Sequence, residues 1–249
     1  MKFADKVVIV TGAGSGIGRS ISHCFAKEGA TSIIAELRSD AGQKVAVEIK
    51  NEGGKALAIK TDVSKREEVL SMVKKVMDEL GKIDILVNNA ALVTGMSFKY
   101  FYETDPDEWE REIGVDWLGV LNCCHAVIPH MIKQNSGKIV SITSDASKIS
   151  TPRQSVYSGN KAAIAGFSRT IAGELARFGI NVNCVAPGTV DTPATQGLGK
   201  IIDKMIQGVP KKRLARPDEI ASMVMYLCSE EADYITGQHI SVSGGMTMF

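Results

Sequence analysis

One glycine-rich stretch constrains the fold of this chain more than any other feature: Thr11-Gly12-Ala13-Gly14-Ser15-Gly16-Ile17-Gly18. It directly follows Val7–Val10, an apolar β-branched run of strand length, and it opens a helix that we expect to begin near Arg19. Glycines here let the backbone turn sharply and let a pyrophosphate approach the free N–H groups of a helix N-terminus. The order predicts a dinucleotide site, and a strand-to-helix turn without a ligand is the alternative.

Further short apolar runs of the same style recur along the chain. They are Ile33–Ile34, Ala56–Ile59, Ile83–Val87, Lys138–Ile142 and Ile180–Val185. Near-continuous apolar strands are typical of a parallel sheet that is covered on both faces, and segments of helix length lie between them. We therefore predict an α/β fold of the Rossmann type: a doubly wound, mostly parallel sheet with helices on both faces, in a single domain over residues 1–249.

Capping signals place several of these helices. Lys65–Leu80 has apolar residues at helical spacing, with a capping box of Ser64 and Glu67 at its start and Gly81 at its end. A further helix should open at Thr104-Asp105-Pro106 and run towards Lys133, and others should span Val156–Phe178 and start at Pro217.

Composition excludes several classes of protein. With 29 Lys+Arg against 28 Asp+Glu and 44% hydrophobic residues, the chain is neither a dedicated nucleic-acid binder nor disordered. Its five cysteines form no CxxC pair, which favours reduced thiols and a cytoplasmic location. The N-terminal apolar run is too short for a signal peptide, and no apolar stretch suggests a membrane span. We expect no metal, because Cys123-Cys124-His125 point in different directions on a helix.

Glu36 stands at the end of the second predicted strand, 18 residues beyond Gly18. A carboxylate there can accept hydrogen bonds from both ribose hydroxyls and would repel a 2′-phosphate, which favours NAD over NADP as the cofactor. Arg38 leaves NADP open as the alternative cofactor, since its guanidinium is able to bind a 2′-phosphate.

Tyr157 and Lys161 lie four residues apart at the start of a predicted helix, and so on one face of it. An ammonium close to a phenol stabilises the phenolate, which an acid/base working near neutral pH requires. Ser144 ends the strand before this helix, at the carboxyl edge where α/β sheets bind ligands, and its hydroxyl can hold a substrate oxygen. Taken alone, the pair could equally be structural.

The chain resembles the classical short-chain dehydrogenase/reductase family over essentially its whole length. The resemblance rests on motifs in one order: the glycine-rich turn, Asp62-Val63, Asn88-Asn89-Ala90, Ser144, Tyr157-Ser158-Gly159-Asn160-Lys161, Pro187-Gly188 with Thr192, Arg216-Pro217-Asp218-Glu219-Ile220, and Ile235-Thr236-Gly237-Gln238.

This resemblance implies roles for the matching residues. Tyr157 would be the general acid/base, Lys161 would hold the nicotinamide ribose, and Ser144 would orient the substrate oxygen. The implied cofactor contacts, beyond Glu36 and these two, are Gly12, Ser15, Gly16, Ile17, Gly18, Asp62, Val63, Asn89, Ala90, Pro187, Gly188, Val190 and Thr192. The implied activity is hydride transfer between a secondary alcohol or ketone and NAD.

Departures from the family pattern occur at three positions. Asp116 stands where the family usually has Asn, whose backbone carbonyl binds a water linked to the lysine; Asp116 keeps that carbonyl but loses the amide donors, so we expect an altered proton relay and retained activity. Ala91 replaces a glycine in the Asn-Asn-Ala-Gly motif. Ser243 replaces an Asp before Gly244-Gly245, which puts the C-terminal packing in question.

The segment 193–210 falls where the family carries its substrate lid. Basic residues gather in and near it: Lys148, Arg153, Lys200, Lys204, Lys211, Lys212 and Arg213. Such a cluster attracts an anion, so the leading substrate hypothesis is a secondary alcohol with an anionic group, such as a 3-hydroxyacyl-CoA. A solvated surface is the alternative interpretation of the cluster.

Other functions and assemblies stay open at this point. One is a 3-oxoacyl-thioester reductase of the fatty-acid type, against which Glu36 speaks because that role usually needs NADPH. Another is a non-catalytic NAD-binding subunit. We expect a small-molecule substrate, and either a homotetramer, which the apolar tail Met246–Phe249 would suit, or a heteromer with a related chain.

Overall fold

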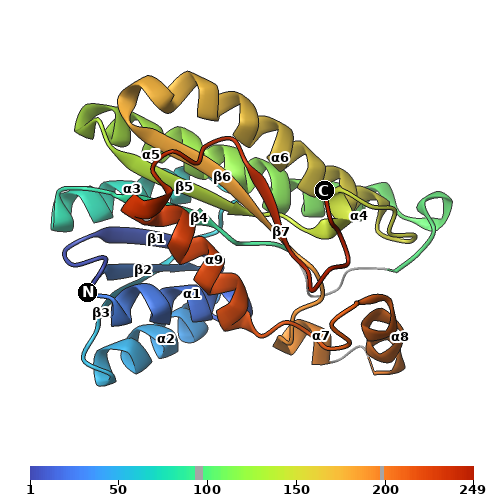
Figure 1. Cartoon of the computed structure of the whole chain (residues 1–249). Coiled ribbons are helices and arrows are strands. Elements are labelled where there is room, and N and C mark those ends of the chain that lie inside the picture. The colour runs from blue at the N-terminus through green and yellow to red at the C-terminus, as the bar shows by residue number, and fades with distance from the viewer. Residues whose placement is uncertain (93–97, 197–198) are drawn as a thin grey trace.

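A sheet of seven parallel strands crosses the molecule (Figure 1) in the order β3-β2-β1-β4-β5-β6-β7. The computed structural model describes residues 1–92, 98–196 and 199–249. The strands are β1 (Val7–Thr11), β2 (Thr31–Glu36), β3 (Lys55–Lys60), β4 (Ile85–Asn88), β5 (Gly137–Ile142), β6 (Ile180–Pro187) and β7 (His239–Val242). The chain passes from the β3 edge back to β4 beside β1, so the strand order reverses there. The predicted doubly wound α/β fold is confirmed.

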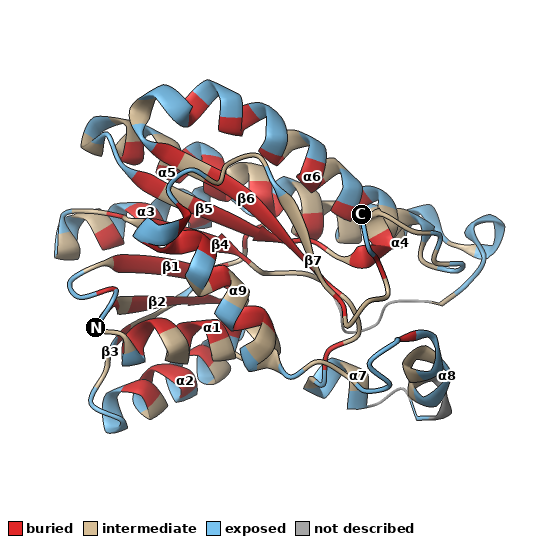
Figure 2. Ribbon diagram, in the orientation of Figure 1, coloured by how far each residue is buried: buried red, intermediate tan, exposed pale blue. Residues whose placement is uncertain are grey.

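Helices cover both faces of the sheet. One face carries α1 (Gly16–Lys27), α2 (Ser39–Asn51) and α9 (Pro217–Cys228), and the other carries α3 (Arg66–Leu80), α5 (Gly119–Gln134) and α6 (Ser155–Leu175). Alternate strand residues serve the two layers: Val8 packs with α1, whereas Ile9 packs with α3 and α5. The inner strands β2, β1, β4, β5 and β6 are therefore buried along most of their length, as Figure 2 shows, whereas the edge strands β3 and β7 are only partly buried. Burial of apolar area on both faces is the main stabilising contribution.

Three details differ from the sequence predictions. α1 begins at Gly16, before Arg19, because the backbone enters the helix inside the glycine-rich turn itself. The predicted capping box of α3 is wrong: the helix starts at Arg66, and the Ser64 hydroxyl donates to Asp62 Oδ1 at 2.7 Å instead. Gly81 ends α3 as predicted, at φ +73°. β7 was not anticipated, because its residues are only half-buried and include His239.

The helix predicted to run from Pro106 towards Lys133 is present but interrupted. It comprises α4 (Pro106–Ile113), the π-helical segment η2 (Gly114–Leu118) and α5, and the Asp105 carboxylate accepts a hydrogen bond from the Asp107 N–H at its start. By length and mean hydropathy this one helix could cross a membrane. Its buried side chains pack against the sheet instead, as those of a core helix do.

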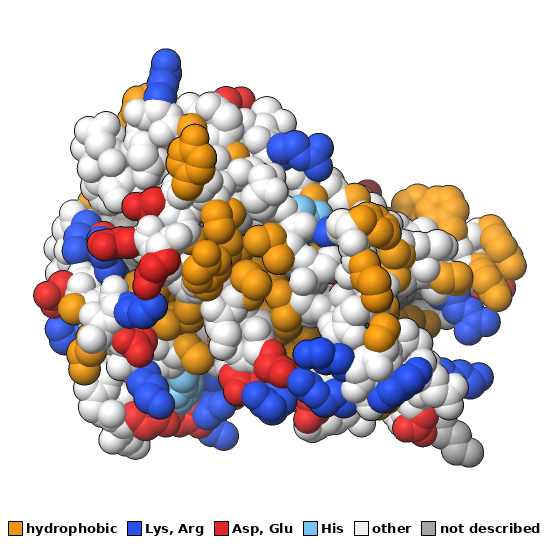
Figure 3. Space-filling view, in the orientation of Figure 1, with side chains coloured by type: hydrophobic (Ala, Val, Ile, Leu, Met, Phe, Trp, Pro, Cys, Tyr) orange, Lys and Arg blue, Asp and Glu red, His pale blue; other side chains and the backbone are white. Residues whose placement is uncertain are grey.

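Shorter elements lie around the carboxyl edge of the sheet. Within the expected lid, α7 (Pro193–Gln196) and α8 (Lys200–Gly208) lie together at one end of the molecule (Figure 1), while residues 197–198 of that lid lie outside the described residues. The 3₁₀ turns are η1 (Phe101–Glu103), η3 (Asp145–Ser147), η4 (Ala176–Phe178) and η5 (Glu230–Ala232). Around η1, Tyr100, Phe101 and Tyr102 are exposed, and Figure 3 shows hydrophobic side chains gathered there.

Candidate active site

Where the strand order reverses, the ends of β1 and β4 are joined by hydrogen bonds of two side chains, Thr11 and Asn89. Thr11 Oγ1, at the end of β1, accepts hydrogen bonds from the backbone N–H groups of Asn89 and Ala90, both at 3.0 Å. In return the Asn89 amide donates to Thr11 O at 2.9 Å and to Gly12 O at 3.1 Å. The loop after β4 and the glycine-rich turn therefore form one rigid wall. Crevices outside the carboxyl ends of strands at such a point bind ligands in α/β proteins.

The glycine-rich turn is tightly packed from behind. A Cβ on Gly12 would lie 2.8 Å from Ala90 Cα, and one on Gly18 would lie 2.5 Å from the Asn89 amide nitrogen. Ser15 is the N-cap of α1, and in the described part of the chain its side chain makes no capping hydrogen bond. The first N–H groups of α1, around Ile17, are thus left to an anion, which fits a pyrophosphate at this end of the helix.

Glu36 ends β2 beside this turn and is only 8% exposed. Its Oε2 accepts a hydrogen bond from the Gly14 N–H at 2.9 Å, and its Oε1 accepts one from the Arg38 N–H at 3.1 Å. The Arg38 side chain, 62% exposed, points its Nε back to Glu36 Oε1 at 3.6 Å. The carboxylate is thus fixed at the position expected for a ribose contact, with the nearby guanidinium already turned towards it.

Asp62 and Val63 follow β3 in a loop that the rest of the protein holds in place. Asp62 Oδ1 accepts hydrogen bonds from the N–H and the hydroxyl of Ser64, and Val63 O accepts one from the Asn122 side chain at 2.9 Å. Val63 also packs directly against Gly119 at the start of α5. The loop is therefore preformed where the resemblance expects contacts with an adenine.

The three residues expected to do chemistry come from two adjacent elements. Ser144 follows β5 and is half-buried; its Oγ accepts a hydrogen bond from the Ala146 N–H at 3.2 Å. Tyr157 and Lys161 lie one turn apart near the start of α6, with the Lys161 Nζ 5.5 Å from the centre of the Tyr157 ring. Contacts between α6 and η3 bring the helix against the turn that Ser144 opens. A phenol beside a buried ammonium is an arrangement suited to proton transfer.

Lys161 is buried together with an acidic partner. Its Nζ lies 3.1 Å from Asp116 Oδ2 and 3.5 Å from the Ile142 carbonyl oxygen. Burial lowers the pKa of Lys161, but the Asp116 carboxylate, with Tyr157 and Glu112, outweighs it and raises this pKa above its ordinary value. Lys161 is therefore held as an ammonium by the protein itself.

The segment after β6 reaches back to the glycine-rich turn. A Cβ added to Gly16 would lie 3.3 Å from Thr192 Cγ2, so these two positions share one wall. Val190 is buried and bridges to Ala215 in parallel register. Gly188, directly after Pro187, packs against Ser243, and Ser243 Oγ accepts a hydrogen bond from the Thr247 N–H at 3.3 Å. The serine that departs from the family pattern therefore supports the C-terminal packing.

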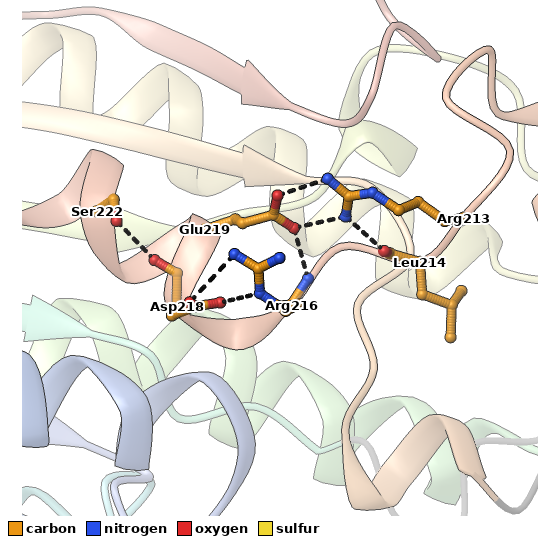
Figure 4. Close-up of polar contacts among 6 residues, drawn as sticks. All are labelled: Arg213, Leu214, Arg216, Asp218, Glu219 and Ser222. Atoms are coloured by element: carbon orange, nitrogen blue, oxygen red, sulfur yellow. Dashed lines mark hydrogen bonds and ion pairs between the residues drawn. The ribbon is translucent and has the colours of Figure 1, made fainter.

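Most of the basic cluster is engaged elsewhere in the molecule. Lys148 Nζ donates to the carbonyl oxygens of His239 and Phe249, and Lys212 Nζ donates to Gln207 O. Arg213 forms a two-pronged pair with Glu219, at 2.7 and 2.6 Å (Figure 4). Arg153 stacks over the Tyr100 ring at 4.7 Å. Of these four side chains only Arg213 is paired with an acidic side chain, and the other three have carbonyl or aromatic partners, so attraction of an anionic substrate stays a prediction.

The residues that a metal would need are dispersed. Cys123 and Cys124 are both buried in the apolar core of α5, where burial raises the pKa of the Cys124 thiol to about 12. Across residues 1–92, 98–196 and 199–249, no group of three His, Cys, Asp or Glu side chains is placed to hold a metal ion.

Comparison with known proteins identifies the family of this chain. A family model described as enoyl-(acyl carrier protein) reductase matches residues 12–247. The chain is 39% identical over 246 residues to the 3-oxoacyl-[acyl-carrier-protein] reductase FabG of Staphylococcus epidermidis, covering 98% of this chain and 100% of that protein. It is 36% identical to FabG of Thermotoga maritima over the full length of both chains. The chain belongs to the short-chain dehydrogenase/reductase family.

A solved structure of the family agrees with this assignment. A 3-oxoacyl-[acyl-carrier protein] reductase with bound NAD from Brucella melitensis superposes with a TM-score of 0.91 at 32% identity, over 100% of this chain and 93% of that one. The chain is thus an oxidoreductase of the short-chain dehydrogenase/reductase family, which acts between an alcohol and a ketone with a nicotinamide dinucleotide. The rigid turn, the uncapped N-terminus of α1 and the fixed carboxylate of Glu36 fit that cofactor.

Two residues of the site, Leu92 and Glu112, were not predicted from the sequence. Leu92 N–H donates to Asp116 Oδ1 at 2.7 Å, and the Asn160 amide donates to Glu112 Oε1 at 3.5 Å beside Lys161. The four-residue spacing of Glu112 and Asp116, which places both acids on one face of a helix, is the signal that could have found the second acid. Nothing in the sequence pattern points to Leu92, because it contributes only its backbone.

Proposed function

We propose that this chain is an NADH-dependent reductase that converts a 3-oxoacyl thioester to the 3-hydroxyacyl thioester. The observation that carries the proposal is the Tyr157 phenol beside the buried Lys161 ammonium, on a helix packed against the turn opened by Ser144. The names of the FabG relatives support this substrate class. They favour the 3-oxoacyl-thioester reductase over the leading hypothesis from the sequence, a dehydrogenase of an anionic secondary alcohol such as a 3-hydroxyacyl-CoA.

The chemistry divides between the cofactor and the protein. A bound nicotinamide would supply the hydride to the ketone carbon. Tyr157 donates its phenolic proton to the ketone oxygen, Ser144 donates a hydrogen bond to the same oxygen, and Lys161 stabilises the phenolate that is left. In the oxidation direction the same groups work in reverse, with the phenolate accepting the proton of the alcohol.

The preference for NADH rests on Glu36. Its carboxylate is almost fully buried and is fixed by two backbone N–H groups, so it cannot swing away from a 2′-phosphate. Arg38 is turned towards Glu36, which supports its role as a partner of the carboxylate over a role as a phosphate ligand. The bound NAD of the Brucella melitensis reductase shows that a relative of this kind takes the same cofactor.

The deciding experiment measures NADH oxidation with one 3-oxoacyl group presented as the acyl-carrier-protein thioester, the CoA thioester and the N-acetylcysteamine thioester. Tyr157→Phe should lose at least about a hundredfold in kcat while NADH affinity, followed by its fluorescence, stays within about twofold. A similar kcat/KM for all three carriers would exclude recognition of the carrier. Turnover of simple ketones, steroids or sugars without turnover of any thioester would contradict the proposed substrate.

The same measurement distinguishes an enzyme from the alternative of a non-catalytic NAD-binding subunit. A protein that binds NADH normally but turns over nothing in this panel would be a nucleotide-binding subunit. The CoA arm also tests the anionic-substrate hypothesis at low and high salt, since attraction between exposed charges weakens as ionic strength rises.

A further inference from the structure

The reaction steps proposed above assign no role to the side chain of Asp116. It lies in η2 with no exposed surface, and its two oxygens have different partners. Oδ1 accepts the Leu92 N–H at 2.7 Å, so it holds the loop that follows Asn89 and Ala90. Oδ2 faces the Lys161 Nζ at 3.1 Å. A buried carboxylate thus touches both the catalytic lysine and a wall of the cofactor crevice.

A second acid stands one helical turn earlier. Glu112 in α4 is half-buried, and burial together with the Asp116 charge raises its pKa above the ordinary value. Its Oε1 accepts a long hydrogen bond, 3.5 Å, from Asn160, the neighbour of Lys161. Glu112 reaches only the neighbour of the lysine, whereas Asp116 Oδ2 lies 3.1 Å from the Lys161 Nζ itself, so Asp116 is the acid in direct ion-pair contact with the lysine.

Other charged and titratable groups lie on the packed elements, among them Lys148 and Arg169, whose charges act on Cys184 and His239. On β6, burial raises the pKa of the Cys184 thiol to about 11, which keeps it neutral. In η3, Asp145 is fully buried, and its charge acts on His239 of β7, where burial is the larger influence and lowers the pKa to about 4. The charged groups that the described contacts place beside Tyr157 are therefore the Lys161 ammonium, 5.5 Å from the centre of its ring, and the Asp116 carboxylate paired with that ammonium.

The sign of their effect on the phenol follows from simple electrostatics. A lone buried ammonium strongly favours the phenolate of Tyr157, because opposite charges attract in a site that water screens poorly. A carboxylate 3.1 Å from that ammonium makes the pair nearly neutral. The pair therefore attracts the phenolate less strongly than a lone ammonium would, so the protonated phenol persists to a higher pH.

We propose that Asp116 is a positioning residue that holds Lys161 in a neutral ion pair and thereby keeps Tyr157 in the protonated form that donates to a ketone. This inference rests on the proposed role of Tyr157 as the proton donor. The overall equilibrium of the reaction is unchanged by any enzyme residue. What Asp116 sets is the pH range over which each direction is fast: reduction stays fast to higher pH, and oxidation needs higher pH to begin.

The test is a titration of Tyr157 that needs no substrate. The near-ultraviolet phenolate absorbance of the full chain, with NAD bound, is recorded against pH, and the same curve for Tyr157→Phe is subtracted to remove the other four tyrosines of the five. In Asp116→Asn, paired with its own Tyr157→Phe double variant, the midpoint should fall by about one pH unit or more, a tenfold change in ionisation. The high-pH limb of kcat/KM for reduction should move down by the same amount.

The outcomes separate the proposal from its alternatives. Asn at this position still accepts the Leu92 N–H, so a purely structural Asp116 would change stability without moving either curve, and an unmoved midpoint overturns the proposal. If Asp116→Asn does not fold, the unmodified protein decides: a Tyr157 midpoint well below the ordinary value of about 10 overturns the proposal, and a midpoint at or above that value supports it. Absence of turnover would contradict the proposed function alone, because the absorbance titration is independent of activity.

Discussion

At the scale of single residues, the site depends on groups that the fold has fixed before any ligand arrives. Glu36 is the clearest example, since both of its oxygens are held by backbone N–H groups of the turn and of its own loop. The sequence predicted its place and its consequence for the cofactor. It left the role of Arg38 open, because only the structure orients that guanidinium towards the carboxylate.

Replacing Glu36 with Gln should change the cofactor preference. An amide keeps an acceptor for the Gly14 N–H but removes the charge that repels a 2′-phosphate, so kcat/KM for NADPH relative to NADH should rise about tenfold or more, roughly 1.4 kcal/mol. The exposed Glu79→Gln serves as the matched control and should leave the ratio unaltered. A ratio that is the same in Glu36→Gln and the parent protein would show that selectivity lies elsewhere.

Asp116 marks the limit of prediction at this scale. The sequence shows that an acid replaces the usual asparagine, and from this we expected a change in a water-linked relay through its backbone. The structure places the side chain itself on Lys161. No spacing rule could have shown this, because the contact depends on how the π-helical segment η2 turns residue 116 towards α6.

At the scale of elements, helix starts carry much of the polar organisation. α9 begins at Pro217, where the sequence predicted it, and Glu219 accepts a hydrogen bond from the Arg216 N–H at 2.8 Å while pairing with Arg213 (Figure 4). The predicted start of α3 is wrong because the Ser64 hydroxyl donates a hydrogen bond to the Asp62 carboxylate, a local partner that competes with the helix N–H groups. Local competition of this kind is invisible to a capping pattern.

Glu219 gives α9 a defined pH dependence. The hydrogen bond from Arg213, followed by that from the Arg216 backbone, lowers the pKa of Glu219 to about 2 in the folded protein. A depressed folded-state pKa stabilises the fold above the unfolded value of about 4.3, and the stabilisation is lost as pH falls from there towards 2. Glu219→Gln should therefore lower Tm at neutral pH, and the deficit should shrink below about pH 4.

Thermal unfolding at several pH values checks this expectation, with the exposed Glu79→Gln as the control variant. A deficit that is constant from neutral to acid pH would mean that the loss comes from packing and not from the charge. High salt should reduce the deficit at neutral pH, since the pair is exposed.

At the scale of the whole molecule, the surface carries apolar residues that the single chain leaves uncovered. Met248 and Phe249 at the C-terminus are each 81% exposed, and Tyr226 on α9 is 46% exposed. The sequence predicted a subunit interface from the apolar tail alone. The assembly itself depends on a second copy, which no pattern within one chain can define.

We expect a homotetramer in solution and a weaker one when the tail is made polar. Sedimentation velocity should give four times the 26.7 kDa chain mass for the parent protein. Met248→Ser with Phe249→Ser removes apolar area without touching the buried Thr247, and should shift the protein towards smaller species as it is diluted. A monomeric parent protein at micromolar concentration would contradict the expectation.

The joining of β1 to β4 sets the order in which this molecule can be built. The glycine-rich turn comes from residues 11–18, yet its back wall is made by Asn89 and Ala90, which become available only after three complete strand–helix units have been synthesised. Pairing between strands so distant along the chain is slow, because the loop between them must be ordered first. A growing chain therefore contains the cofactor-binding motif well before the cofactor site is complete. Binding of the nucleotide can stabilise the folded state only after β4 has paired with β1.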